Sequence, residues 1–107
     1  MAHLQAEPTL RVLQDYLASV CQERGWTKDT PAEKFVLFVE EVGELAKAIR
    51  KSNGQKIDKA RRQHDVEEEL ADVFWLLIDL SNRLDVDLAK AFEAKEKINQ
   101  KRQWTDA

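Results

Sequence analysis

The fold of this chain is decided by residues 66–80, which read VEEELADVFWLLIDL. In a helix that advances about 100° per residue, Leu70, Val73 and Leu77 form one apolar stripe, and residues 75, 76 and 78 cover much of the remaining surface. A helix that is apolar on almost every side is normally buried. The stretch therefore predicts a central helix, and because a chain of 107 residues has a small core, a second chain is expected to help cover it.

Two carboxylates interrupt this apolar stretch. Glu69 and Asp72 are three residues apart, so a helix places them on the same side. An unpaired carboxylate is costly to bury, and buried carboxylates are therefore paired with cations or bind metals. The pair predicts that an opposing charge or a metal lies close to it.

Two helices are expected before the central one. The first spans about residues 8–24 and ends at Gly25, which suits a left-handed cap. The second follows a capping box made by Thr30 and Glu33, has Pro31 at its first position, and runs to about residue 51. Residues 53–63 are polar and basic, and are expected to form a loop or a weak helical lead-in.

The predicted fold is all-α, a bundle of four helices in one domain that covers residues 1–107, with a loose end over residues 1–7. Asp65 is expected to cap the central helix, and Asp85 or Asp87 the fourth. Gly43, inside the second helix, predicts close approach of another backbone. Inward-facing side chains are expected on the second and fourth helices: Phe35, Phe38, Val39, Val42, Leu45, Ala46 and Ile49, then Leu88, Phe92 and Ile98.

A second acidic cluster lies on the helix that precedes the central one. Glu40, Glu41 and Glu44 share one side of that helix, and packing against the central helix would bring four or five carboxylates together. Such a group requires a cation, and oxygen ligands favour magnesium, manganese or calcium over zinc. Magnesium usually keeps positions for water and substrate phosphates. The two clusters therefore indicate phosphate-ester or phosphoanhydride chemistry.

Composition argues against several other classes of protein. The net charge of −3 gives no overall basic field, which argues against nucleic-acid binding. A single cysteine, Cys21, excludes an intrachain disulfide and fits a reducing compartment. No apolar run reaches the length of a membrane span, so the expected location is the cytoplasm. A di-iron bundle needs Glu-x-x-His pairs, and neither His3 nor His64 has a glutamate three residues before it.

The two acidic motifs together resemble a known family. Residues 40–46, Glu-Glu-Val-Gly-Glu-Leu-Ala, and residues 69–73, Glu-Leu-Ala-Asp-Val, are similar to the motifs of the MazG-like all-α nucleoside triphosphate pyrophosphatases, and within them to the dCTP pyrophosphatase-like branch. The similarity covers about residues 26–104, including a Lys…Asn…Arg segment near the end. It implies hydrolysis of nucleoside or deoxynucleoside triphosphates to the monophosphate and pyrophosphate, and assembly as a homo-dimer or homo-tetramer.

The resemblance also implies roles for individual residues. Glu41, Glu44, Glu69 and Asp72 would hold Mg²⁺, with Mn²⁺ as the alternative metal. Glu40 would be an accessory acid or orient a ligand, and either one of these carboxylates or the metal would activate the attacking water. The substrate would be contacted by four residues: Trp26 stacking on the base, and Lys95, Asn99 and Arg102 on the triphosphate.

Some features leave the function open. Many relatives have a large aromatic residue for sugar contact after the second acidic motif, where this chain has Trp75 and Leu76. Asp79 is an additional acid that fits a surface residue, a partner for an arginine or a further metal contact. The alternative to an enzyme is a non-catalytic helical binding or assembly module that keeps the family fold.

Overall fold

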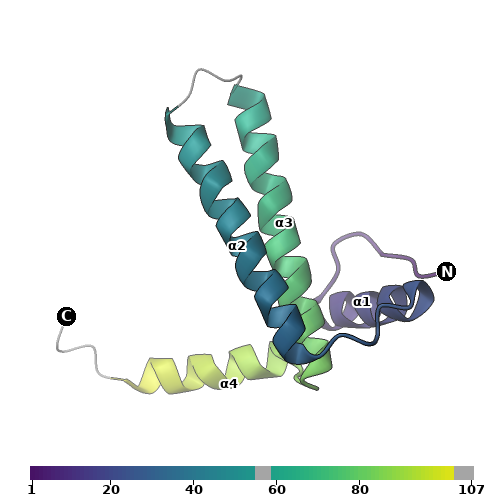
Figure 1. Cartoon of the computed structure of the whole chain (residues 1–107). Coiled ribbons are helices and arrows are strands. Elements are labelled where there is room, and N and C mark those ends of the chain that lie inside the picture. The colour runs from purple at the N-terminus through teal and green to yellow at the C-terminus, as the bar shows by residue number, and fades with distance from the viewer. Residues whose placement is uncertain (55–58, 103–107) are drawn as a thin grey trace.

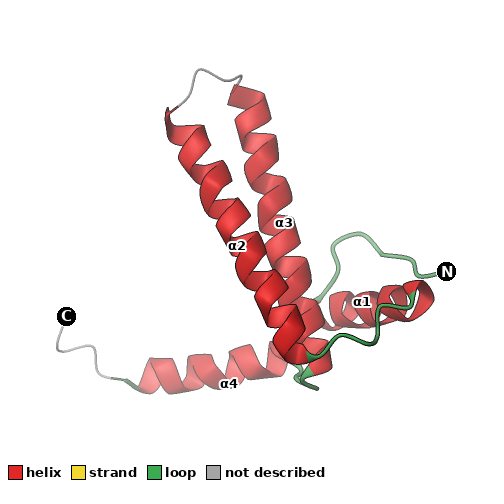
Figure 2. Cartoon of the chain, viewed as in Figure 1, coloured by secondary structure: helices red, strands yellow, loops and turns green. Residues whose placement is uncertain are grey.

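The structure is a computed structural model that describes residues 1–54 and 59–102, and it is all-α as predicted. Figures 1 and 2 show four helices: α1 (Leu10–Arg24), α2 (Pro31–Gly54), α3 (Lys59–Arg83) and α4 (Leu88–Lys101). Over the described ranges, no helix combines the length and the apolar composition that a membrane span needs.

The ends of α1 and the start of α2 follow the local sequence signals. Thr9 caps α1 by accepting a hydrogen bond from the backbone N–H of Val12, at 3.1 Å. Gly25 closes α1 with a left-handed backbone, φ +72°, as predicted. The backbone N–H of Glu33 donates to the hydroxyl of Thr30 at 3.2 Å, and the Glu33 carboxylate accepts from the Thr30 backbone at 3.4 Å. The predicted capping box is therefore confirmed.

The helical lead-in to the central helix is confirmed, whereas the predicted cap at Asp65 and the end of the second helix at about residue 51 are wrong. α2 continues to Gly54 and α3 begins at Lys59, so Asp65 lies inside α3 and does not cap it. Residues 59–64, Lys-Ala-Arg-Arg-Gln-His, contain no Gly or Pro and are mostly good helix formers, which lets the helix start earlier. The fourth helix is capped by Asp87, whose carboxylate accepts from the Lys90 N–H at 3.0 Å.

The four helices do not close into a bundle within one chain. α2 and α3 form a long hairpin, α1 packs against α3, and α4 packs mainly against α1. Figure 1 shows α1 and α4 lying across one end of the hairpin, with α4 pointing away from it. No residue of α4 is buried, and Phe92 is 65% exposed. The predicted inward face of the fourth helix is therefore wrong for a single chain.

The faces of α2 also differ from the prediction. The side chains that approach α3 recur at steps of three and four residues, and are Lys34, Phe38, Glu41, Leu45 and Ala48. The neighbouring stripe of Phe35, Val39, Val42, Ala46 and Ile49 is exposed instead of buried. A side chain added at Gly43 would meet nothing within 4 Å, so no backbone approaches it in this chain.

The tightly packed core is small and lies where α1 crosses α3. Its apolar members are Leu17, Val20, Cys21 and Ile78, and they are accompanied by four buried polar or charged residues: Gln14, Lys34, Asp79 and Ser81. Away from this crossing, the hairpin is therefore held together by the contact between α2 and α3. The charged residues in that contact, Lys34 and Glu41 on α2 and Glu69 on α3, are the starting point for the site.

Candidate metal centre

Three carboxylates meet across the α2–α3 contact. Glu41 of α2 and Glu69 and Asp72 of α3 each offer one oxygen, and these oxygens lie within 4.8 Å of one another. Glu41 and Glu69 are half-buried because they occupy the face of each helix that meets the other, whereas Asp72 is exposed at the edge. The hairpin thus brings together three of the four residues that the family motif assigns to a metal.

The electrostatics at Glu69 are unfavourable without a cation. Burial raises the pKa of the Glu69 carboxyl, and the hydrogen bond with Glu41 and the charges of Glu41, Asp72 and Glu44 raise it further. Its Oε2 atom is shielded from solvent and has no hydrogen-bond partner. A buried acceptor without a partner costs about 1–3 kcal/mol in general, and native proteins usually satisfy such atoms.

The residues present therefore fit a divalent cation. Carboxylate oxygens from two helices are the ligands that Mg²⁺ and Mn²⁺ prefer. One buried oxygen, Oε2 of Glu69, lacks a partner within the protein and is available for such an ion. A bound dication would also relieve the repulsion that raises the pKa of Glu69.

Two predicted acids lie outside this cluster. Glu44 is one turn further along α2 and lines a recess of about 130 Å³ with Glu69, Glu68, Lys47 and Lys51. It is close enough to contribute to the raised pKa of Glu69. Glu40 is exposed on α2 and is not among the three residues whose oxygens converge.

A larger hollow lies on the other side of the acids. It has a volume of about 340 Å³ and is lined by Arg24, Trp26, Glu41, Asp72, Trp75 and Leu76. The rings of Trp26 and Trp75 meet edge to face with centroids 6.3 Å apart. Trp26 is 43% exposed, so part of its ring is open to a ligand. The structure therefore places the predicted Trp26 beside two of the predicted metal acids.

Arg24 is a residue of this hollow that the sequence reasoning missed. Its guanidinium carbon lies 5.0 Å from the centre of the Trp26 ring, over its face, in a cation–π arrangement. The sequence signal was weak, since Arg24 is simply a basic residue in the last turn of α1, which the helix dipole alone would explain. The sequence indicated Trp75 only as a candidate for sugar contact, and the structure shows that it lines the hollow beside Trp26.

The remaining predicted substrate contacts are remote from the acids. Lys95, Asn99 and Arg102 are on or directly after α4, which packs mainly against α1 and points away from the hairpin (Figure 1). The side chain of Asn99 donates to Glu96 on its own helix, at 3.3 Å. Asp79, whose role was open, is buried and pairs with Arg83 at 3.2 Å, so it is an arginine partner and not a member of the acidic cluster.

Comparison with known proteins agrees with this geometry. Residues 30–105 match the family model described as the MazG nucleotide pyrophosphohydrolase domain. The chain belongs to the MazG family. Residues 103–105 of the match lie outside the part of the chain that the structure describes. The MazG family uses a divalent metal, and the cluster of Glu41, Glu69 and Asp72 supplies acids of the required kind.

Two relatives of this MazG chain come from Bacillus subtilis (strain 168). The chain is 31% identical over 102 residues to the protein named "Uncharacterized protein YpjD", a match that covers 89% of this chain and 92% of that protein. It is 25% identical over 96 residues to "Uncharacterized protein YvdC", covering 83% and 91% respectively. These two matches extend over most of the chain, and the names of the two relatives give no substrate.

Proposed function

We propose that this MazG chain is a Mg²⁺-dependent nucleoside triphosphate pyrophosphohydrolase. It would cleave a nucleoside or deoxynucleoside triphosphate between the α and β phosphates and release the monophosphate and pyrophosphate. The observation that carries the proposal is the buried, unpartnered Oε2 of Glu69 within a cluster of three carboxylates, beside a hollow walled by Trp26 and Trp75. A metal held by these acids would bind the phosphates of a nucleotide, and the tryptophan rings would contact its base.

The acids have separate tasks in this proposal. Glu41, Glu69 and Asp72 hold Mg²⁺ or Mn²⁺, and Glu44, one turn away, completes the set from its neighbouring recess. The bound ion supplies positive charge to the α–β phosphoanhydride. The attacking water would be activated either by a carboxylate, for which Glu40, Glu41 and Glu44 are the candidates on α2, or by the metal.

The order of groups along the hairpin favours one orientation of the substrate. The tryptophan hollow lies toward the base of the hairpin, the acids follow, and the recess with Lys47 and Lys51 lies beyond them. The base would stack near Trp26, where a base–aromatic contact is worth about 1–3 kcal/mol. The leaving pyrophosphate would then lie toward Lys47 and Lys51, with the bound metal offsetting the acids that line the same recess: Glu44, Asp65, Glu68 and Glu69.

A second copy of the chain is part of the proposal. The exposed stripe of Phe35, Val39, Val42, Ala46 and Ile49 repeats every 3.5 residues on average, which is the spacing of helices that pack as a coiled-coil or four-helix bundle. Helical geometry puts exposed Leu70 and Phe74 of α3 on the same face. Two hairpins packed through this face would make the predicted bundle, as a dimer or as a tetramer built from two dimers.

The same assembly offers a route for the α4 residues. Lys95, Asn99 and Arg102 are remote from the acids of their own chain, because α4 points away from the hairpin. Within the proposal they contact the triphosphate of a neighbouring copy. Within the proposal, the side chains around the hollow of Trp26 and Trp75 determine which base and sugar are preferred. A preference for dCTP would place the chain in the dCTP pyrophosphatase-like branch.

The test is a panel of the standard ribo- and deoxyribonucleoside triphosphates with Mg²⁺, with products separated by ion-exchange chromatography. We expect the monophosphate and pyrophosphate in equal amounts, with dCTP among the substrates. Glu69→Gln and Asp72→Asn should each lower the rate at least about 100-fold, since even groups that only orient metal ligands are worth 10- to 100-fold. Glu93→Gln, on exposed α4, is the matched control and should keep full activity.

Two outcomes would contradict the proposal. Release of orthophosphate instead of pyrophosphate would indicate a different phosphate chemistry. Folded protein that hydrolyses no nucleotide with Mg²⁺ or Mn²⁺ would favour the non-catalytic module.

A further inference from the structure

A second cluster of charges lies outside the metal centre, where α1, α2 and α3 meet. Asp79 is only 2% exposed and Lys34 6%. One oxygen of Asp79 lies 3.3 Å from Nζ of Lys34, and the other lies 3.2 Å from Nε of Arg83. Because desolvation offsets most of the attraction within a buried ion pair, such a cluster is a poor device for stability alone. The charge cluster is therefore of interest for the groups that it holds in place.

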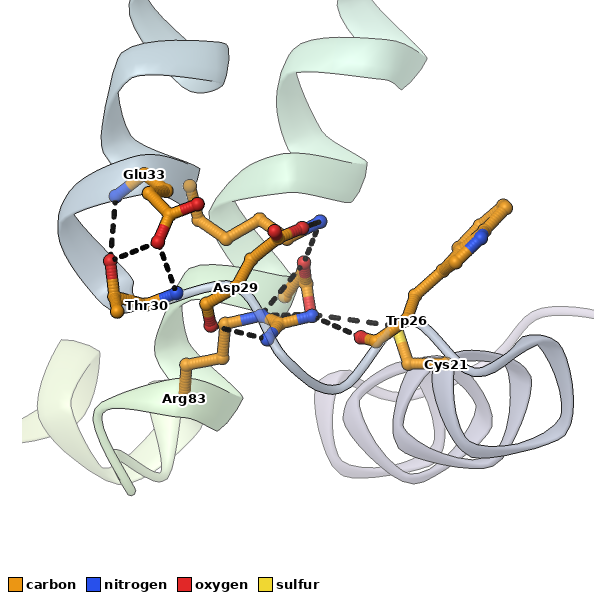
Figure 3. Close-up of polar contacts among 8 residues, drawn as sticks. Cys21, Trp26, Asp29, Thr30, Glu33 and Arg83 are labelled. Carbon is orange, nitrogen blue, oxygen red and sulfur yellow. Dashed lines mark hydrogen bonds and ion pairs between the residues drawn. The ribbon is translucent and has the colours of Figure 1, made fainter.

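The Arg83 side chain reaches from this cluster to the connector between α1 and α2. Its Nη1 donates to the backbone carbonyl of Asp29 at 2.8 Å, and its Nη2 donates to the carbonyl of Trp26 at 2.5 Å. Figure 3 shows the guanidinium between these two carbonyls. Every nitrogen of the guanidinium thus has a partner, and the two carbonyls bracket residues 27 and 28.

The backbone of Trp26 is fixed on both sides. Its N–H donates to the carbonyl of Cys21 at 2.8 Å, and its carbonyl accepts from Arg83. The residue is 43% exposed, and it lines the hollow that Glu41 and Asp72 also line. The contacts of its ring with Trp75 and Arg24 require the main chain of Trp26 to stay in place, so the orientation of the ring toward the acids also depends on the backbone that carries it.

We infer that Arg83, anchored by buried Asp79, is the positioning residue that sets Trp26 for the base of the nucleotide. It determines substrate affinity without touching the substrate. Its planar fork can reach both carbonyls and Asp79 together, which a lysine cannot do. The choice of ligand depends on the proposed function, whereas the fixing of Trp26 does not.

The test compares Arg83→Lys with Arg50→Lys, the same change at an exposed position of α2. Arg83→Lys should raise KM for the preferred nucleotide about 10-fold, within the range of one lost base–aromatic stack, and leave kcat within about twofold. In a Trp26→Ala background, Arg83→Lys should add nothing to KM, because both changes remove the same interaction. Arg50→Lys should change neither constant.

A second measurement needs no activity. In a variant whose other two tryptophans are phenylalanine, time-resolved fluorescence anisotropy reports the motion of the Trp26 ring. Arg83→Lys should increase the amplitude of its fast motion, and Arg50→Lys should not. Asp79→Asn should give a smaller increase, because Arg83 then keeps its carbonyl bonds and loses its ionic anchor. Circular dichroism confirms that each variant is folded at the temperature used.

The outcomes separate the two proposals. Unchanged Trp26 motion in folded Arg83→Lys and Asp79→Asn overturns the positioning role, whatever the enzyme activity. An equal rise of KM with and without Trp26 also overturns it. Absence of hydrolysis in the parent protein, together with increased Trp26 motion in Arg83→Lys, overturns only the proposed function.

Discussion

Gln14 of α1 and Asn82 of α3 are joined by two hydrogen bonds that run in opposite directions. The Gln14 side chain donates to Oδ1 of Asn82 at 2.9 Å, and the Asn82 side chain donates to the Gln14 carbonyl at 2.9 Å. Gln14 also donates to the carbonyl of Val86 at 2.8 Å and accepts from the N–H of Leu88 at 3.0 Å. One buried amide therefore connects α1, the end of α3 and the first residue of α4.

This connection predicts a stability effect. Gln14→Ala leaves the part-buried carbonyl of Val86 and the first N–H of α4 without their partners, and should lower the free energy of unfolding by about 1–3 kcal/mol. Urea denaturation followed by circular dichroism measures it. Gln22→Ala, an exposed change on the same helix, should stay within about 0.5 kcal/mol of the parent. Equal effects of the two substitutions would contradict the role of Gln14.

The acids across α2 and α3 predict a dependence of stability on pH and Mg²⁺. The pKa of Glu69 is raised, so the folded protein without metal binds a proton more tightly at this site than the unfolded chain does. Its stability should therefore fall as pH rises from the ordinary carboxyl pKa through the raised one. Mg²⁺ competes with that proton, so it should raise Tm more at about pH 7.5 than at about pH 5.

The Glu69→Gln variant checks this link between charge and metal. It should melt at a higher temperature than the parent when metal is absent at neutral pH, because a neutral side chain replaces a repelled carboxylate. Its Tm should no longer respond to Mg²⁺. Differential scanning calorimetry gives both values, and Glu93→Gln should behave as the parent does. A parent Mg²⁺ shift that is the same at both pH values would refute the link.

The environment of Cys21 predicts low thiol reactivity. Burial raises the pKa of the Cys21 thiol, and the nearby Asp79 carboxylate, 3.6 Å from the sulfur, raises it further. The thiolate fraction near neutral pH is therefore below that of a free cysteine, and alkylation by iodoacetamide should be at least about 100-fold slower in the native protein than in urea. Mass spectrometry follows this directly because Cys21 is the only cysteine in the sequence. Comparable rates in the two states would show that the thiol is accessible.

The open face of the hairpin predicts self-association. The parent should sediment as a dimer or larger at micromolar concentration, and Val39→Glu should shift it toward the monomer, since the new charge lies in the exposed apolar stripe. Val36→Glu is the matched control, because residue 36 lies on the polar side of α2 with Glu40 and Lys47. Sedimentation velocity distinguishes the two. A monomeric parent would remove the proposed second copy.

Local signals in the sequence predicted the local structure well. Thr30 and Glu33 form their capping box and Gly25 closes α1, because each motif involves backbone groups only three or four residues away. The meeting of Glu41 with Glu69 and Asp72 was also predictable, since two adjacent antiparallel helices put their acidic sides together. The caps need no knowledge of the rest of the chain, and the acidic cluster needs only that α2 and α3 pack side by side.

The features that the sequence did not predict depend on tertiary or quaternary context. The apolar stripe that begins at Phe35 was expected to face the core, but it is exposed in the single chain. Helical periodicity shows that a face is apolar, and it does not show what covers that face. The Arg83–Trp26 contact joins residues 57 positions apart, and no spacing rule connects them. The Asp65 cap is a local exception: it was wrong because good helix formers precede it and α3 begins at Lys59.

The way in which Arg83 holds the connector has a consequence for how this site can diverge. Arg83 binds main-chain carbonyls, which every amino acid has, so its two hydrogen bonds do not depend on the side chains of Trp26 and Asp29, although the Asp29 carboxylate also pairs with Lys34 at 3.4 Å. The side chain at position 26 can therefore change without removing the acceptor that Arg83 binds. Position 26 of the connector can thus carry a different side chain on the same backbone, and a different ligand preference can arise there without a change in the helices.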